Sequence, residues 1–183
     1  MGPDRIPADW PLRDCSEFIH CGEIVWHTQR IGAGPVVLLL HGTGASSHSM
    51  AGLATLLSRQ FTCVLIDLPG QGFTPALGER KHLLSAMSSA VADLCDQLDL
   101  VPDYVIGHSA GAAVGIRMSL DTPIAPKGIL SINGALLPFG AFIEPMMIKA
   151  ARGLSQSSRV VHFLARRGAG KAYVRRALRD TGA

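Results

Sequence analysis

The stretch from Tyr104 to Gly115, YVIGHSAGAAVG, decides the fold of this chain. An apolar segment leads into Ser109, Gly107 and Gly111 lie two residues to either side of the serine, and small residues follow. An exposed nucleophile needs a tight turn from strand to helix, where only residues with almost no side chain fit. The G-x-S-x-G pattern also occurs by chance, in ordinary glycine-rich loops. Its meaning therefore depends on the segments around it.

The rest of the chain alternates between strand-like and helix-like segments. Residues 17–32 predict a hairpin that turns at Cys21-Gly22. Short apolar runs predict buried strands, and three- and four-residue spacing of apolar side chains predicts helices between them. The strands are expected within 35–42, 61–68, 103–109 and 127–137, and the helices within 49–60, 83–100 and 110–120. This alternation predicts an α/β fold with a mostly parallel sheet and flanking helices, and it makes Ser109 a predicted nucleophile.

Two glycine-containing loops follow the neighbouring strands and would meet Ser109 at one edge of the sheet. The first contains His41, Gly42 and Thr43, and the second is DLPGQGFT, residues 67–74. Acyl transfer places negative charge on a carbonyl oxygen, which two backbone N–H groups can stabilise. We predict that the N–H groups of Thr43 and Ala110 form this oxyanion hole. His41, Gly42, Gly107, His108 and Gly111 are the predicted supporting residues.

These motifs, in this order and spacing, resemble the α/β-hydrolase fold family. HGTGASSHSM, DLPGQGFT, GHSAGAA and above all SINGALLPF are more closely similar to BchO, the family of magnesium-chelatase accessory proteins in bacteria that make bacteriochlorophyll. The resemblance extends from about Trp10 to Phe139. It implies a role in supporting the insertion of magnesium into protoporphyrin IX, and hence a part in photosynthesis.

The same family implies that the acid and the base of a catalytic triad follow later strands, in the chain order Ser, Asp, His. After Phe139 the sequence offers Glu144, Asp180 and His162, in a segment that reads as short helices. We therefore expect an N-terminal fragment that stops before the last two core strands. Residues 1–138 would form the first part of the core, with 128–136 as an open edge strand, and residues 139–183 would form a helical lid.

For other candidate partners of Ser109, the sequence favours a structural role over a catalytic one. His108 is adjacent to Ser109, but neighbours on a sharp turn diverge. His41 is expected to brace the oxyanion loop, and His162 to pack within the lid, although chain order permits it as a base. Asp67 is expected to hold the turn that follows it by hydrogen bonds. Asn133 follows the strand after Ser109, but an amide cannot stabilise an imidazolium as a carboxylate does.

The expected lid is strongly basic. Its cationic side chains are either a solvated helix surface or a docking site for an acidic partner, porphyrin propionates or an anionic membrane surface. No nucleic-acid partner is expected, because no recognised binding motif accompanies the charge. The cationic residues are Lys149, Arg152, Arg159, Arg166, Arg167, Lys171, Arg175, Arg176 and Arg179.

Composition narrows the class of protein. The chain has 183 residues, 48% hydrophobic and 17% charged, with a net charge of +3, which suits one substantial core. Its longest apolar run, residues 36–40, is too short to span a membrane, and no secretory signal is visible, so a cytoplasmic location is expected. Its four cysteines lack the spacing of a zinc site or a disulfide framework. We expect no metal and no cofactor.

Two functions follow from these observations. The first is a serine hydrolase that acts on an ester or similar acyl substrate through an acyl-Ser109 intermediate. The second is a non-hydrolytic accessory protein that uses the same pocket to hold a tetrapyrrole or to contact subunits of the magnesium chelatase. An acid and a base in the family's expected positions would favour the hydrolase.

Overall fold

The computed structural model describes residues 6–78, 84–134 and 136 of the chain. Contacts divide the chain into two units, Met1–Leu136 and Leu137–Ala183, and the fold described below is that of the first. The expected lid, residues 139–183, lies outside the described residues. The same is true of Glu144, His162, Asp180 and the basic residues of that segment.

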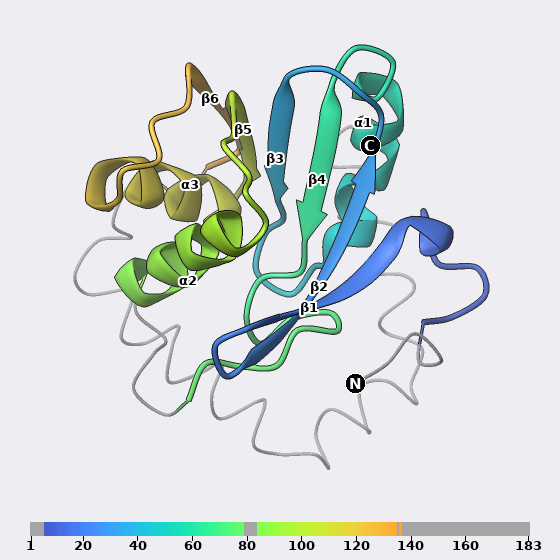
Figure 1. Ribbon diagram of the computed structural model, residues 1–183, viewed down its shortest axis with the longest axis horizontal. Helices are drawn as coiled ribbons and strands as arrows, with labels where there is room; N and C mark the ends of the chain where they lie inside the picture. Colours follow the sequence, from blue (N-terminus) through green and yellow to red (C-terminus); the bar gives the residue numbers. More distant parts are fainter. Residues whose placement is uncertain (1–5, 79–83, 135, 137–183) are drawn as a thin grey trace, which may run out of the picture. The chain divides into compact units, whose positions relative to one another are not determined.

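Six strands form one mixed sheet in the order β1-β2-β4-β3-β5-β6 (Figure 1). β3, β4, β5 and β6 run parallel, while β1 and β2 form an antiparallel hairpin that joins the sheet by antiparallel pairing of β2 with β4. This is the mostly parallel sheet that the sequence predicts. The strands are β1 (Ser16–Cys21), β2 (Ile24–Ile31), β3 (Val36–Leu40), β4 (Thr62–Ile66), β5 (Tyr104–His108) and β6 (Gly128–Ile132).

The hairpin turns one residue later than the sequence predicts. Cys21 pairs with Ile24, so Gly22 and Glu23 form the two-residue connection. Gly22 has a φ of 58°, a conformation that glycine adopts without steric cost. The glycine therefore belongs to the first central position of the turn rather than to its second.

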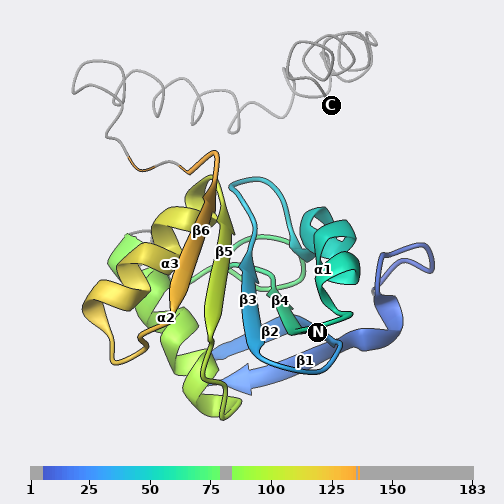
Figure 2. The same cartoon turned by 90° about the horizontal axis from the view of Figure 1, so that it is seen from above.

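Helices cover both faces of the sheet, as buried strands require (Figure 2). Side chains of β3 alternate between two cores: Val37 and Leu39 pack with Met50 and Ala54 on the side of α1, whereas Leu38 and Leu40 pack on the side of α2 and α3. The helices are α1 (Ala51–Leu57), α2 (Leu84–Gln97) and α3 (Ala110–Asp121), and short 3-10 helices span Arg13–Cys15 and Ser47–Met50.

The cysteines behave as small core residues where they are buried. All four are free thiols, and Cys63 and Cys95 lie in the core. Burial, reinforced by Asp96, raises the pKa of Cys95 to about 12, so this thiol stays protonated and unreactive at neutral pH. The described part of the chain contains no group of three or more side chains that could hold a metal ion. Among its helices, none has the length and apolarity that crossing a membrane requires.

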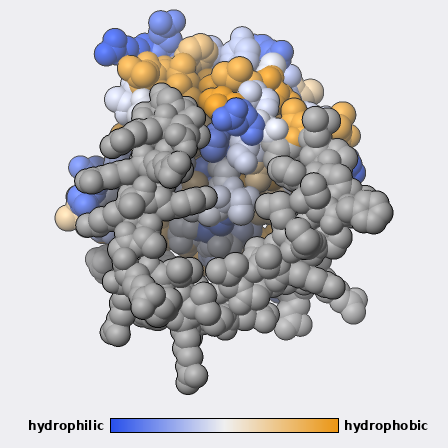
Figure 3. All heavy atoms as spheres, turned by 180° about the vertical axis from the view of Figure 1, so that it is seen from behind, coloured by the Kyte–Doolittle hydropathy of each residue, from blue (hydrophilic) through white to orange (hydrophobic). Residues whose placement is uncertain are grey.

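β6 lies at one end of the strand order within the described residues, as the sequence led us to expect. Leu130 and Ile132 on this strand are 56% and 36% exposed. A shallow apolar groove of about 350 Å³ runs beside it, lined by residues of β3, α1, β5 and β6, among them Leu57 and Tyr104, and by Phe61, which precedes β4. Apolar side chains also gather on the upper part of the face seen in Figure 3.

Candidate active site

Four parallel strands end at the same edge of the sheet and bring the predicted site residues together. His41 follows β3, Asp67 follows β4, Ser109 follows β5 and Asn133 follows β6. Open α/β sheets bind their ligands at this carboxyl edge, because the loops there are free to differ without disturbing the core. The candidate site is built from these loops.

Ser109 lies in a strained turn between β5 and α3. Its φ and ψ are 51° and −116°, a conformation that is uncommon for a residue with a side chain. A Cβ atom on Gly107 would overlap the backbone of Ala112, and one on Gly111 would overlap the carbonyl oxygen of Leu40. Both positions therefore require glycine for the reason that the sequence suggested. Ser109 itself remains half-buried rather than enclosed.

The loop after β3 lies directly against this turn. A Cβ atom on Gly42 would be only 3.1 Å from the Cβ of Ser109, which shows how closely the two backbones approach. Thr43 follows on the exposed side, and Ala110 begins α3, where the first N–H groups have no partner within the helix. Within the described part of the chain, neither the Thr43 nor the Ala110 N–H donates a hydrogen bond to a protein acceptor. The N–H of Gly44, in contrast, donates to Oε1 of Gln71 at 2.6 Å.

His41 joins the loops after β3 and β4. The Leu68 N–H donates to its Nε2 at 2.9 Å, and its Nδ1 donates to the carbonyl oxygen of Gly42 at 2.8 Å. Because Leu68 can only donate here and Gly42 can only accept, these partners fix a neutral imidazole with the proton on Nδ1. Burial lowers the pKa of His41, and the opposing influences of the Gly42 carbonyl and Asp67 do not cancel this effect. His41 thus braces the loop that contains Thr43.

The lowered pKa of His41 predicts a stability change near neutral pH. The unfolded chain takes up a proton at the ordinary histidine pKa, which the folded protein resists, so stability falls as the pH drops below about 6.5. We expect the free energy of unfolding to decrease between about pH 7.5 and pH 5.5, and to decrease less in His41→Gln, which cannot titrate. Urea unfolding at the two pH values measures the difference. Equal decreases in both proteins would contradict this role for His41.

Asp67 holds the loop after β4, and it accepts more hydrogen bonds than the sequence suggested. One carboxylate oxygen accepts a hydrogen bond from the Phe73 N–H at 2.8 Å, which confirms that Asp67 holds the following turn. The same oxygen accepts from Nδ1 of His27 at 2.9 Å, and the second oxygen accepts from the Ser47 N–H at 2.6 Å. Burial by itself would raise the pKa of Asp67, but the hydrogen bonds from His27, Ser47 and Phe73 prevail and lower it.

The sequence did not lead us to anticipate the hydrogen bond between His27 and Asp67 or the one between Gln71 and Gly44. His27 lies on β2 and is fully buried, with its ring against those of Trp10, Phe18 and Phe73. It is 40 residues from its partner Asp67, and no local pattern signals a pairing over that separation. A histidine hydrogen-bonded to an aspartate is also found in catalytic triads. Here, however, both side chains have 0% exposure, so a substrate cannot reach them.

No histidine or acidic side chain within the described residues forms a hydrogen bond with Ser109. His108 lies beside Gly42, where a Cβ atom would be 2.9 Å from its Nδ1, and it is not bonded to the serine. Asn133 has a φ of 46° and follows the strand whose last residue, Ile132, accepts a hydrogen bond from the Ser109 N–H at 2.9 Å. β6 therefore supports the turn through its backbone.

Comparison with known proteins identifies a family that has this fold. Residues 35–163 match the family model of the alpha/beta hydrolase fold. The chain is 36% identical over 187 residues to the Magnesium-chelatase 30 kDa subunit of Rhodobacter capsulatus, with 100% of this chain and 64% of the relative covered, which confirms the resemblance carried by SINGALLPF. It is also 36% identical over 110 residues to a fluoroacetate dehalogenase from Burkholderia sp, with 58% of this chain and 36% of the relative covered.

Solved structures of other proteins share this fold. A variant of an epoxide hydrolase from Vigna radiata superposes with a TM-score of 0.59 at 26% identity, over 63% of this chain and 37% of that chain. The chain thus spans less than two thirds of the length of these relatives. The family-model match covers β3 to β6, Ser109 and both loops around it, and the chain belongs to the α/β-hydrolase fold family.

Proposed function

We propose that the protein is a serine hydrolase that cleaves an ester or similar acyl bond. In this reaction Ser109 Oγ attacks the acyl carbonyl, and the N–H groups of Thr43 and Ala110 stabilise the resulting oxyanion. The observation that carries the proposal is the strained Ser109, held beside two N–H groups that have no acceptor among the described residues. Strain of about 1–3 kcal/mol persists where the surrounding structure holds it in place, and it concentrates at active sites.

The mechanism assigns distinct tasks to the surrounding residues. A base must remove the Ser109 proton, and by the family's chain order we expect this base and its acidic partner after Phe139. His41 keeps the Thr43 loop in place, because its neutral ring joins Gly42 to Leu68. The oxyanion forms on the carbonyl oxygen as the serine attacks, and it collapses to an acyl-serine as the protonated base gives its proton to the leaving alcohol. Water then loses a proton to the same base and attacks the acyl-serine, and collapse of the second oxyanion releases the carboxylic acid and restores the Ser109 hydroxyl.

The similarity to the Magnesium-chelatase 30 kDa subunit suggests where such an activity would be used. We propose that the protein supports magnesium insertion during bacteriochlorophyll biosynthesis, with subunits of the magnesium chelatase as partners and a small acyl compound or a tetrapyrrole as ligand. A cytoplasmic location and peripheral membrane contact through residues 139–183 belong to the same proposal.

The name of that relative also favours a second candidate function, because it describes a chelatase subunit rather than a hydrolase. In this alternative the pocket beside Ser109 binds a tetrapyrrole or a chelatase subunit without chemistry. The two candidates differ in what they require of Ser109, since only a hydrolase needs a reactive hydroxyl.

Fluorophosphonate labelling of the natural full-length protein distinguishes the candidates. We expect the probe to modify Ser109, because attack by its hydroxyl creates negative charge that the proposed donors, the Thr43 and Ala110 N–H groups, would stabilise, and we expect Ser109→Ala to remain unlabelled. Mass spectrometry of the digested protein maps the adduct. Labelling at another serine, or no labelling at all, would reject the hydrolase and leave the accessory function.

A further inference from the structure

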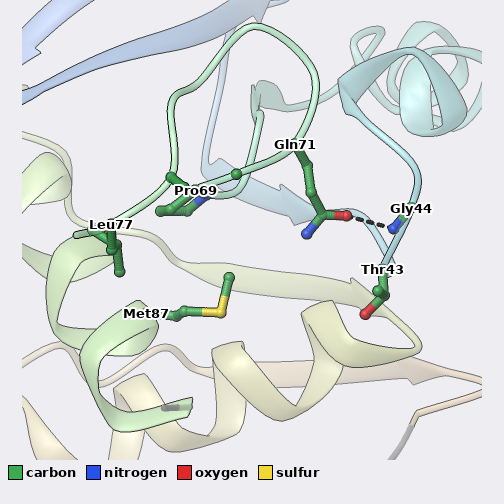
Figure 4. Close-up of a pocket in the computed structure, with 8 residues that line it drawn as sticks. Thr43, Gly44, Pro69, Gln71, Leu77 and Met87 are labelled. Atoms are coloured by element: carbon green, nitrogen blue, oxygen red, sulfur yellow. Dashed lines mark hydrogen bonds between the residues drawn. The ribbon is translucent and has the colours of Figure 1, made fainter. Parts of the chain in front are cut away.

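A cavity of about 480 Å³ lies next to the loop that carries Thr43 (Figure 4). Its volume is that of a small-molecule site. Thr43 and Gly44 form one wall, while Pro69, Leu77 and Met87 give it an apolar lining. Ser109 does not line the cavity, but the loop that does lies against Ser109 through Gly42. The cavity therefore adjoins the loop that packs against Ser109.

Among the described residues that line this cavity, Gln71 alone has a side chain that ends in an amide, and a hydrogen bond with Gly44 sets its orientation. A backbone N–H can only donate, so the Gly44 N–H must face the oxygen of the Gln71 amide, which it does at 2.6 Å. The amide nitrogen then points away from Gly44, into the space between Pro69 and Met87 (Figure 4). The assignment of oxygen and nitrogen thus follows from the donor that Gly44 supplies.

The backbone of Gln71 is held as firmly as its side chain. The Gln71 N–H donates to the Leu68 carbonyl at 3.0 Å, and its own carbonyl accepts from the Thr74 N–H at 3.1 Å. Asp67 closes the same turn through Phe73. The amide N–H donors are therefore placed in advance, and little conformational freedom is lost when a ligand accepts a hydrogen bond from them.

The chemistry of the lining selects the kind of acceptor. None of the described residues that line the cavity is charged, so none of them would pair with a ligand carboxylate to offset the hydration that it loses. A ketone, ester or ether oxygen loses far less hydration and needs only one donor. The apolar side chains of Leu77 and Met87 suit the methylene groups on either side of such an oxygen.

We propose that Gln71 is a specificity-determining residue that selects neutral acyl chains carrying a second oxygen acceptor. This inference rests on the proposed function for the direction of the acyl chain, which runs from Ser109 into the cavity. Gln71 then has two tasks: its oxygen holds the Gly44 N–H, and its nitrogen recognises the substrate. Only the second task depends on the NH₂ group.

Binding to the Ser109→Ala protein tests the proposal without requiring turnover. Dissociation constants are measured by NMR titration for phenyl 4-oxopentanoate and phenyl 5-oxohexanoate, each against the parent ester without the oxo group. We expect at least one oxo ester to bind about three- to tenfold more tightly than its parent, the range of one neutral hydrogen bond. Introducing Gln71→Glu into the same protein should abolish this preference, because a carboxylate keeps the acceptor for Gly44 but presents no N–H.

Two further variants complete the test. Gln71→Met loses both tasks, and it should lose the preference as well. Gln60→Glu makes the same chemical change at an exposed glutamine outside the cavity and should keep the preference. Equal binding of oxo and parent esters in both pairs, or a preference that survives Gln71→Glu, overturns the inference. A preference without fluorophosphonate labelling of Ser109 would reject the hydrolase and still support Gln71 as the recognition residue.

Discussion

Replacing Ser109 with alanine should lower the hydrolysis of p-nitrophenyl butyrate by the natural protein by about four to six orders of magnitude. A serine nucleophile and its base act as one unit, so removal of the nucleophile leaves only the contribution of the oxyanion donors and of binding. The Thr43 and Ala110 N–H groups remain in Ser109→Ala, and they account for the residual rate. Initial rates at saturating ester measure the loss.

The fold should survive this change. Alanine keeps the Cβ atom that already occupies the strained conformation, so the free energy of unfolding should differ little between the two proteins. Ser119→Ala is the matched control, because it removes a hydroxyl from α3, the helix that follows Ser109, and within the described residues that hydroxyl donates only to the Ile116 carbonyl. Loss of activity in Ser119→Ala, or retention of activity in Ser109→Ala, would argue against the assigned nucleophile.

Replacing Asp67 with asparagine should lower the free energy of unfolding by about 3–5 kcal/mol. The carboxylate accepts hydrogen bonds from His27, Ser47 and Phe73 while fully buried. An asparagine side chain offers one acceptor oxygen, and its NH₂ group would face donors that it cannot accept from. Some of these buried donors then lose their partner, which costs more than the hydrogen bond itself contributes.

Urea unfolding at neutral pH measures this loss, and the exposed Asp121 provides a control. Asp121 pairs with Arg117 one helical turn away, and Asp121→Asn should cost only about 0.5 kcal/mol or less. The pKa of Asp67 is lowered in the folded protein, so its contribution is present above the ordinary aspartate pKa and is lost as the pH falls. The difference between Asp67→Asn and the unchanged protein should therefore shrink under acid conditions. A pH-independent difference would mean that packing, rather than charge, dominates.

The turn around Ser109 could be predicted from the sequence because its constraints are local. Gly107 permits the close approach of α3 to β5, Gly111 permits that of α3 to the end of β3, and apolar runs on both sides identify the strand and the helix. The alternation of β3 side chains between two cores follows in the same way from a short run that is apolar at every position. These features depend on neighbours within about ten residues, which a linear pattern can encode.

The linked hydrogen bonds around the site depend on tertiary structure. His27 reaches Asp67 because β2 pairs with β4, and Gln71 reaches Gly44 because the loops after β3 and β4 leave the same edge of the sheet. The two partners are 40 residues apart in the first pair and 27 in the second, so no sequence pattern signals that they meet. Each partner could equally have formed its hydrogen bonds with water or with another group. The sequence by itself therefore determined the α/β class, the strained serine and the flanking loops. Only the order of strands in the sheet decided which polar side chains hold those loops together and where the amide of Gln71 points.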